Sequence, residues 1–261
     1  MNVAILGCAV CAPGLPDWSA ACEVLAGREP FDRSAVRDPS PVALPANERR
    51  RLPATARVAL GVGMEALQAA QVDMAEVATV FTSCGSDGEI THQICATLAR
   101  APEQLSPTRF HNSVHNAPGG YWSIAVGSHA PSTSLCAFEG SFAAGLVEAA
   151  VQAVTEARTV LLVAYDLPYP APLSSLWNAA LPFCVAMVLA PRTGSGHPEI
   201  SITLADELIE PDWPDGVPAE MRTNPAAASL PLLALLAQRS AGRAVLPYHA
   251  NNAVIVSMLG S

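Results

Sequence analysis

The sequence predicts an α/β protein in which buried strands alternate with helices along a single chain. Continuous apolar runs such as residues 2–10 and Thr159–Tyr165 are typical of strands that are covered on both faces. Alanine-rich stretches with helical spacing separate these runs, and such alternation favours a layered α/β domain. Apolar residues make up 51% of the 261 residues and charged residues only 14%, which fits a large core or a large buried interface.

The elements are assigned in order from periodicity and from helix start and stop signals. Strands are expected at 2–10, 77–82, 132–138, 159–165, 183–189, 200–204 and 253–258. Helices are expected at 17–26, 55–71, 89–100, 121–126, 140–156 and 230–239. Asp17 is a suitable N-cap for the first helix, and Gly27 is a suitable stop. Residues 37–53 are rich in Pro and Arg and are expected to form a loop.

A linker is expected at Thr193–Pro198, where small residues follow the strand at 183–189. It divides a single domain over 1–261 into an N-terminal half at 1–192 and a C-terminal half at 198–261. The second half is too short to repeat the first, so we expect it to be truncated.

The most informative stretch is Pro131–Leu146, a strand that runs through a sharp turn into a helix of small residues. It resembles the nucleophile turn of the β-ketoacyl synthases of the thiolase superfamily. In that family the eighth residue after the Pro is the Cys that accepts the acyl group, and here that residue is Glu139.

Other segments resemble the same family over roughly residues 2–190. Ala4–Gly7 followed by Ala12–Gly14 is similar to its first strand and turn, and Trp18–Arg28 is similar to its first helix. Further matching positions before the turn are Ser106, Pro107, Asn116, Pro131 and Ser132. The resemblance implies a thiolase-like, layered α-β-α-β-α fold with a shortened C-terminal half.

The family also carries two catalytic His residues in its C-terminal half, and neither of their segments is present. His197 and His249 do not lie in matching frames, so no catalytic residue is expected. The phrase Ser106–Asn116 resembles the short chain-length-factor-like partners of aryl-polyene and xanthomonadin-type pathways. That resemblance implies a non-catalytic subunit that forms a heterodimer with an active ketosynthase. A homodimer of this chain is the alternative. An acyl carrier protein would be contacted through the partner.

Glu139 is a poor substitute for a thiolate, because a carboxylate attacks carbonyls weakly and would form a reactive anhydride. A helix N-terminus does suit a fixed anion, so the N–H groups of 140–142 are expected to hold Glu139 as a plug. Two alternatives stay open. In the first, Glu139 would be the general base of a stand-alone acyl-thioester hydrolase or decarboxylase. In the second, the chain would be a homodimeric protein that binds acyl chains or carrier protein.

Residues that line an acyl pocket or an interface are also expected from the resemblance. Ile90, Ile94 and Leu98 share one helical face, which in relatives holds gate residues, with ordinary core as the alternative. In relatives the strand at 132–138 pairs across the dimer axis and thereby covers a sheet edge. The full set comprises Ile90, Ile94, Leu98, Phe110, Asn116, Phe138 and Glu139.

The Cys and His residues give weaker signals. Seven Cys without regular spacing argue against a secreted disulfide framework, and the apolar context of Cys8 and Cys11 favours core packing over metal or redox chemistry. Cys136 is expected to be an inert core thiol within its strand, and Cys84 to pack at a strand end. His111 and His115 are spaced as two metal ligands on a helix would be, but hydrogen bonds to loop backbone are favoured. Neither a metal nor a cofactor is expected.

The charge and hydropathy of the chain argue against nucleic acid as a partner and against a membrane-spanning segment. The net charge of −9 argues against duplex nucleic acid. Arg49–Arg51 is the one basic cluster, interpreted as a solvated turn or as a contact for an acidic partner such as a carrier protein. No apolar run of about 18 residues is free of breakers, so no membrane span is expected and the cytoplasm is the default location.

Overall fold

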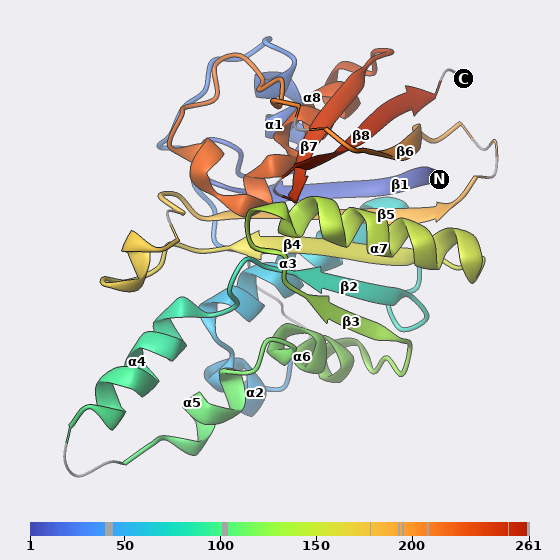
Figure 1. Ribbon diagram of the computed structural model, residues 1–261. Helices are drawn as coiled ribbons and strands as arrows, with labels where there is room; N and C mark the ends of the chain where they lie inside the picture. The colour runs from blue at the N-terminus through green and yellow to red at the C-terminus, as the bar shows by residue number, and fades with distance from the viewer. Residues whose placement is uncertain are drawn as a thin grey trace.

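The computed structural model describes residues 1–39, 44–100, 104–177, 179–192, 194, 196–207, 209–249 and 251–259. Its described strands form one eight-stranded sheet in the order β3-β2-β4-β5-β1-β6-β8-β7 (Figure 1). The strands are β1 (Asn2–Cys11), β2 (Ala78–Thr82), β3 (Ser132–Leu135), β4 (Val160–Asp166), β5 (Phe183–Pro191), β6 (Glu199–Ala205), β7 (Arg243–His249) and β8 (Asn252–Leu259).

The α-helices cover the faces of this sheet, and short 3₁₀ helices connect several elements. The α-helices are α1 (Trp18–Leu25), α2 (Ala46–Arg51), α3 (Ala54–Ala70), α4 (Gly88–Leu98), α5 (Pro107–Asn112), α6 (Ala117–Val126), α7 (Ser141–Thr155) and α8 (Leu230–Gln238). The 3₁₀ helices are η1 (Phe138–Gly140), η2 (Leu173–Ser175), η3 (Met221–Thr223) and η4 (Pro225–Ser229).

Five strands form the central part of the sheet. β3, β2 and β4 run parallel, and β5 runs antiparallel to both β4 and β1. Every residue of β4 is buried, because α3 packs on one face of the sheet and α7 on the other. A strand covered on both faces needs apolar side chains in both directions, which explains its continuous apolar run.

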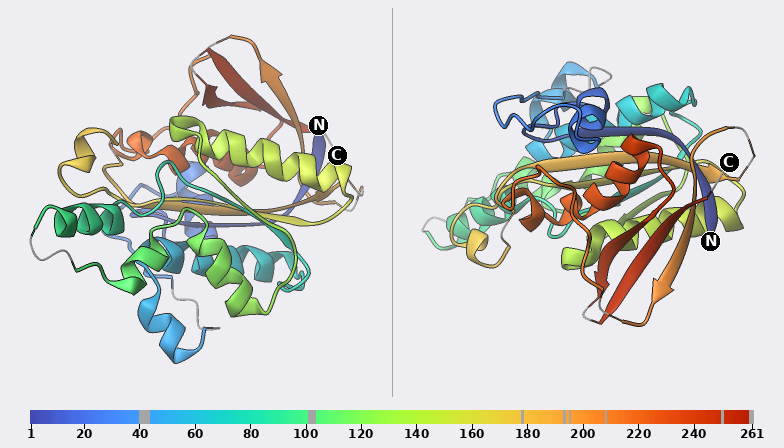
Figure 2. Two further views of the ribbon diagram at one scale, coloured as in Figure 1. Left: turned by 60° about the horizontal axis from the view of Figure 1, so that its bottom comes forward. Right: turned by 90° about the horizontal axis from the view of Figure 1, so that it is seen from above.

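The C-terminal strands extend the sheet from the start of β1. Asn2–Ala4 pairs with β6, and β6, β8 and β7 follow as antiparallel neighbours. In Figure 2 these three strands diverge from the central five, and α7 and α8 pack against β7. The layered α/β architecture predicted from the sequence is therefore confirmed.

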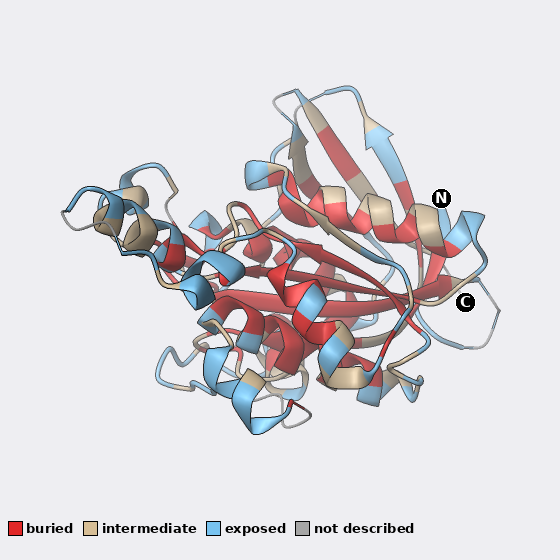
Figure 3. Cartoon of the chain, turned by 90° about the horizontal axis from the view of Figure 1, so that it is seen from below, coloured by how far each residue is buried: buried red, intermediate tan, exposed pale blue. Residues whose placement is uncertain are grey.

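Burial follows these layers. Figure 3 shows buried residues concentrated in the central strands and in the helices against them, whereas the outer helices are mostly exposed or half-buried. α4 illustrates the transition, since Ile90 near its start is buried and Leu98 at its end is exposed. None of the described helices is long and apolar enough to cross a membrane.

Several element boundaries differ from the sequence prediction. The expected loop at 37–53 contains α2, whose Glu48 lies in the first turn and whose arginines lie in the last, as the helix dipole favours. The strand expected at 132–138 ends at Leu135, because β2 ends at its partner Thr82 and offers no further pairing.

Two further differences concern elements that the periodicity did not reveal. α6 begins at Ala117 rather than at 121, with a Pro in its first turn where a missing N–H is tolerated. β7 was not predicted at all. The linker expected at 193–198 includes residues 193 and 195, which lie outside the described residues.

Candidate functional site

A strained turn precedes α7 and contains Glu139, the residue that aligns with the acyl-accepting Cys of the family that the sequence resembles. Phe138 has φ 50°, a left-handed conformation that costs a bulky residue about 1–2 kcal/mol. The hydroxyl of Ser141 holds this conformation, because it accepts from the Ala137 amide at 3.1 Å and donates to the Phe138 carbonyl at 2.6 Å. The turn is therefore fixed by its own hydrogen bonds, while the Phe138 side chain is 65% exposed.

Gly140 sets the contact between this turn and the C-terminal strands. A Cβ at Gly140 would lie 1.8 Å from the carbonyl oxygen of Tyr248 in β7, so no other residue fits there. Thr82 at the end of β2 donates to the Ser141 carbonyl at 2.8 Å. The turn is thus clamped between β2 and β7.

Glu139 does not act as the predicted plug. Its side chain is exposed, and no hydrogen bond joins its carboxylate to any described residue. The amide of Gly140 donates to the Ala137 carbonyl, and the amide of Ser141 donates to the Phe138 carbonyl. Because the 3₁₀ turn uses these donors internally, the expectation that the amides of 140–142 hold the carboxylate was wrong.

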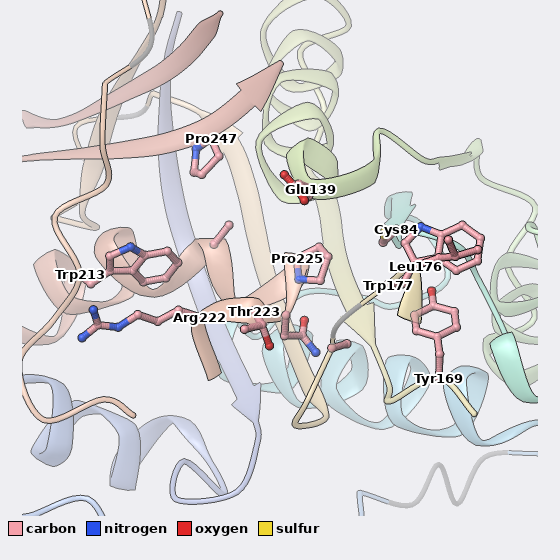
Figure 4. A pocket seen from close by; sticks show the side chains of 13 residues that line it. Cys84, Glu139, Tyr169, Leu176, Trp177, Trp213, Arg222, Thr223, Pro225 and Pro247 are labelled. Carbon is pink, nitrogen blue, oxygen red and sulfur yellow. The ribbon is translucent and has the colours of Figure 1, made fainter. Parts of the chain in front are cut away.

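The Glu139 side chain instead lines a cavity of about 430 Å³. In Figure 4, Glu139 lies between an end formed by Trp213 and Arg222 and an end formed by Tyr169 and Trp177. The Arg222 guanidinium lies 5.7 Å from the Trp213 ring centre, a cation–π distance. The lining residues are Cys84, Glu139, Tyr169, Leu176, Trp177, Ala179, Trp213, Arg222, Thr223, Asn224, Pro225, Ala228 and Pro247.

Asp166, at the end of β4, carries a buried carboxyl and bonds to two residues lining this cavity, Cys84 and Asn224. Its Oδ1 accepts from the Ser83 hydroxyl and from the Cys84 amide, both at 2.9 Å, whereas Oδ2 is buried without a partner. Burial raises the pKa of Asp166 to about 7, although the two hydrogen bonds favour the charged form. Its carbonyl accepts from Asn224 at 2.9 Å, which connects β4 to η4.

Cys84 is the thiol that lines this cavity, and it is not activated. Burial, with smaller contributions from Asp166, Cys136 and Glu139, raises the pKa of Cys84 to about 12. The thiol is therefore protonated near neutral pH and is a weak nucleophile. The prediction that Cys84 packs at a strand end is confirmed, since the residue is buried two positions after the end of β2.

Of the other thiols with a predicted environment, Cys136 differs from the prediction, whereas Cys8 and Cys11 agree with it. Cys136 is exposed, and its Sγ donates to the Cys84 carbonyl at 2.6 Å. The expected core thiol was wrong, because β3 ends one residue earlier and releases Cys136 from the sheet. Cys8 and Cys11 are buried in β1 as predicted, and burial raises the pKa of both thiols.

His115 and Asn112, before α6, bond to backbone carbonyls of neighbouring elements. His115 Nε2 lies 2.8 Å from the Leu135 carbonyl oxygen in β3, and Asn112 donates to the Arg51 carbonyl in α2 at 2.7 Å. For these two side chains the predicted bonds to backbone are present, whereas the ring of His111 lies edge-on to an aromatic ring, with 6.4 Å between the ring centres. Across the part of the chain that the structure describes, no group of three or more His, Cys, Asp or Glu residues could hold a metal ion.

The structure does not gather the predicted pocket residues in one place. Of that set, Glu139 lines the cavity just described and Ile90 lines a second one. Leu98 and Phe110 are exposed on the outer helices α4 and α5. Asn116 is exposed directly before α6, and Ile94 is half-buried on α4, between Ile90 and Leu98.

The sequence did not reveal the residues around Glu139. Asp166, Tyr169, Trp213 and Asn224 come from separate segments that only the tertiary fold brings together. One signal was present, since Asp166 is a charged residue that directly follows the apolar run Val160–Tyr165.

A buried α7, a strained turn at its start and a mixed central sheet define a protein of the ketosynthase class. The family model of the β-ketoacyl synthase N-terminal domain matches residues 25–246. The chain therefore belongs to this family, as the sequence resemblance indicated. No curated protein matches the sequence.

Solved ketosynthase structures share this fold. One is the ketosynthase ApeO in complex with its chain length factor ApeC from Xenorhabdus doucetiae, with 24% identity, a TM-score of 0.73, and coverage of 98% of this chain and 99% of that chain. The ishigamide ketosynthase/chain length factor has 12% identity, a TM-score of 0.70 and 99% coverage of both chains. A β-ketoacyl synthase from Burkholderia phymatum has 12% identity, a TM-score of 0.60, and 91% and 70% coverage. These matches confirm the predicted thiolase-like fold.

Proposed function

We propose that this chain is a non-catalytic, ketosynthase-like subunit of the chain-length-factor type. It pairs with an active β-ketoacyl-acyl carrier protein synthase in polyene, polyketide or fatty-acid-like biosynthesis and shapes the far end of its partner's acyl pocket. The observation that carries the proposal is Glu139, a carboxylate at the position where the family has its nucleophilic thiol.

The chemistry around Glu139 supports a non-catalytic role. The cavity offers one thiol, Cys84, which burial keeps protonated. Glu139 itself is exposed, and no hydrogen bond from a described residue orients its carboxylate for general-base catalysis. Among the described residues that line the cavity, none is an activated thiol that would accept an acyl chain.

The partner is proposed from the solved structures and from exposed apolar side chains. Two matched structures are described as a ketosynthase with its chain length factor, and a third as a type II polyketide acyl carrier protein with its ketosynthase. β3 lies at one end of the sheet order, and an edge strand is a site for pairing with another chain. Leu98, Phe110 and Phe138 are exposed apolar side chains, and we propose that the ketosynthase covers them.

The remaining predicted residues complete the proposed interface. Ile90 and Ile94 lie on the same helix as Leu98, and Asn116 lies at the junction of α5 and α6. We further propose that 1–192 and 198–261 correspond to a full and a truncated half of the ketosynthase fold. The heterodimer would act in the cytoplasm and receive its acyl carrier protein through the active subunit.

Co-expression with the ketosynthase encoded in the same gene neighbourhood tests the proposal. The two chains should co-purify, the complex should extend acyl thioesters, and mass spectrometry of this chain should find no acyl group. Turnover by this chain alone that is lost in Glu139→Gln would instead establish a hydrolase or decarboxylase. A stable homodimer that ignores the ketosynthase would instead support the acyl- or carrier-binding alternative.

The interface has its own test with a matched control. Phe110→Asp places a charge on the proposed interface, where burying it unpaired is expected to weaken co-purification at least about tenfold. Leu204→Asp introduces the same charge at a similarly exposed position on β6, 61% against 64% exposed. Equal loss of pairing in both variants would contradict the proposed surface.

A further inference from the structure

A second cavity of about 560 Å³ shares no lining residue with the one beside Glu139. Three arginines line it, Arg50 and Arg51 from α2 and Arg109 from α5. The whole chain carries a net charge of −9, so three cations around one cavity do not follow from the overall composition. This grouping is a local feature that the proposed function does not use.

Hydrogen bonds fix the backbone that carries these arginines. The Arg51 carbonyl accepts from the Asn112 side chain at 2.7 Å and from the Tyr121 hydroxyl at 3.4 Å. These bonds join the end of α2 to α5 and α6. The Arg109 amide donates to the Ser106 hydroxyl at 3.4 Å, which caps the start of α5. The basic wall of the cavity is therefore built from two helices that are attached to each other.

Of the three guanidinium groups, Arg51 is the one that has an ion-pair partner among the described residues. Arg109 forms no ion pair with any residue that the structure describes. The nearest carboxylate oxygen to Arg51 is on Glu48 at 3.8 Å, and Arg50 bonds to the neutral side chain of Asn47. An anion in the cavity would be attracted by all three positively charged arginines, and it would also reduce the repulsion among them.

The rest of the lining, which consists of two carboxylates and several apolar residues, limits the chemistry of a ligand. Asp87 and Glu89 lie at the start of α4, but Asp87 accepts from the Thr55 hydroxyl at 2.7 Å and from the Ile90 amide at 2.9 Å. Glu89 accepts from Gln93. These two carboxylates repel a second anionic group. The apolar lining consists of Pro53, Ala54, Ile90, Leu167, Pro168 and Pro182.

We propose that this cavity binds an amphipathic phosphate monoester. Arg50, Arg51 and Arg109 hold the phosphate, and the organic group lies along Ile90 and Leu167. A phosphate suits three guanidiniums better than a carboxylate does, because it carries more charge and three free oxygens for paired N–H donors. The binding is proposed for the chain by itself, although Ile90 also belongs to the proposed interface with the ketosynthase.

Calorimetric titration of the purified full chain with hexyl phosphate, inorganic phosphate and hexanol tests the proposal. Hexyl phosphate should bind more tightly than either fragment, because it alone satisfies both the arginines and the apolar lining. Arg109→Ala should weaken hexyl phosphate binding by about tenfold or more, as expected for lost hydrogen bonds to a charged group. Arg109→Lys should recover part of this loss, since it restores the charge without the planar fork.

Arg49→Ala is the matched control. Arg49 lies on α2 beside Arg50 and carries the same charge, but it does not line the cavity. This variant should bind hexyl phosphate within about twofold of the wild type at physiological salt, where screening is strong. Equal weakening in Arg49→Ala and Arg109→Ala would overturn the proposal. So would hexyl phosphate that binds no better than hexanol.

Discussion

Replacement of Asp166 by Asn should change how the stability of this protein depends on pH. In the folded chain burial raises the pKa of this carboxyl from 3.8 to about 7, which favours its protonated form. The unfolded chain has the ordinary pKa, so between these two values the folded state binds more protons. The stabilisation from Asp166 is therefore fully present below about pH 4 and is lost as the pH rises through about 7.

The size of the effect follows from the same two values. Between about pH 5 and pH 8 the wild type should lose roughly 2–3 kcal/mol of unfolding free energy through this one group. Asn keeps an acceptor for the Ser83 hydroxyl and the Cys84 amide but does not ionise. As the pH rises over this range, the unfolding free energy of Asp166→Asn should therefore increase relative to that of the wild type by the same amount. This is equivalent to roughly 5–10 °C in Tm.

Urea denaturation of both proteins at several pH values and constant ionic strength measures this difference. All other titrating groups are shared, so they cancel when the two curves are subtracted. Asp73→Asn serves as the control, because Asp73 is exposed and caps a turn by accepting from the Ala75 amide. Stability curves of wild type and Asp166→Asn that stay parallel from about pH 5 to pH 8 would refute the reasoning.

Four further predictions each use one substitution or one reagent. Phe138→Gly should be more stable than Phe138→Ala by about 1 kcal/mol in denaturant titrations, because only Gly adopts φ 50° without strain. Gly140→Ala should destabilise the fold by more than about 3 kcal/mol or prevent soluble expression, since a Cβ would lie 1.8 Å from a backbone oxygen of β7. Iodoacetamide should label Cys136 in the native protein and Cys84 only after unfolding, which peptide mass spectrometry can show. Cys136→Ser should leave the product of the proposed complex unchanged, and complete loss of product from a well-folded variant would contradict the non-catalytic role.

The central strands could be predicted from sequence because both of their faces are buried. The run at 159–165 carries apolar side chains in both directions, and the structure places β4 there with every residue buried. β7 gave no such signal. It begins with Arg243, contains Pro247 and lies at the outer end of the sheet, where a missing N–H is tolerated. Its place is set by pairing with β8, which local composition does not encode.

Part of the candidate site could likewise be predicted from the sequence, and part could not. The position of Glu139 before α7 followed from the local frame of a strand, a turn and small residues. The destination of its carboxylate did not, because it depends on a 3₁₀ turn that uses the amides of Gly140 and Ser141. Asn224 gave no signal either, although its side-chain amide bonds to the carbonyls of Asp166 and Leu181. Such long-range polar partners are fixed by the assembled fold.

The strained turn at 137–141 carries Glu139 rather than a thiol. Strain of this kind survives where the surrounding structure enforces it. Here Thr82 bonds to the Ser141 carbonyl on one side, and Gly140 lies against the Tyr248 backbone on the other. The turn thus connects β2, α7 and β7, so a looser conformation would remove one of the contacts between the central sheet and its C-terminal extension. This structural role is independent of acyl transfer, so the contacts around the turn are sufficient to hold its geometry with Glu139 at its centre.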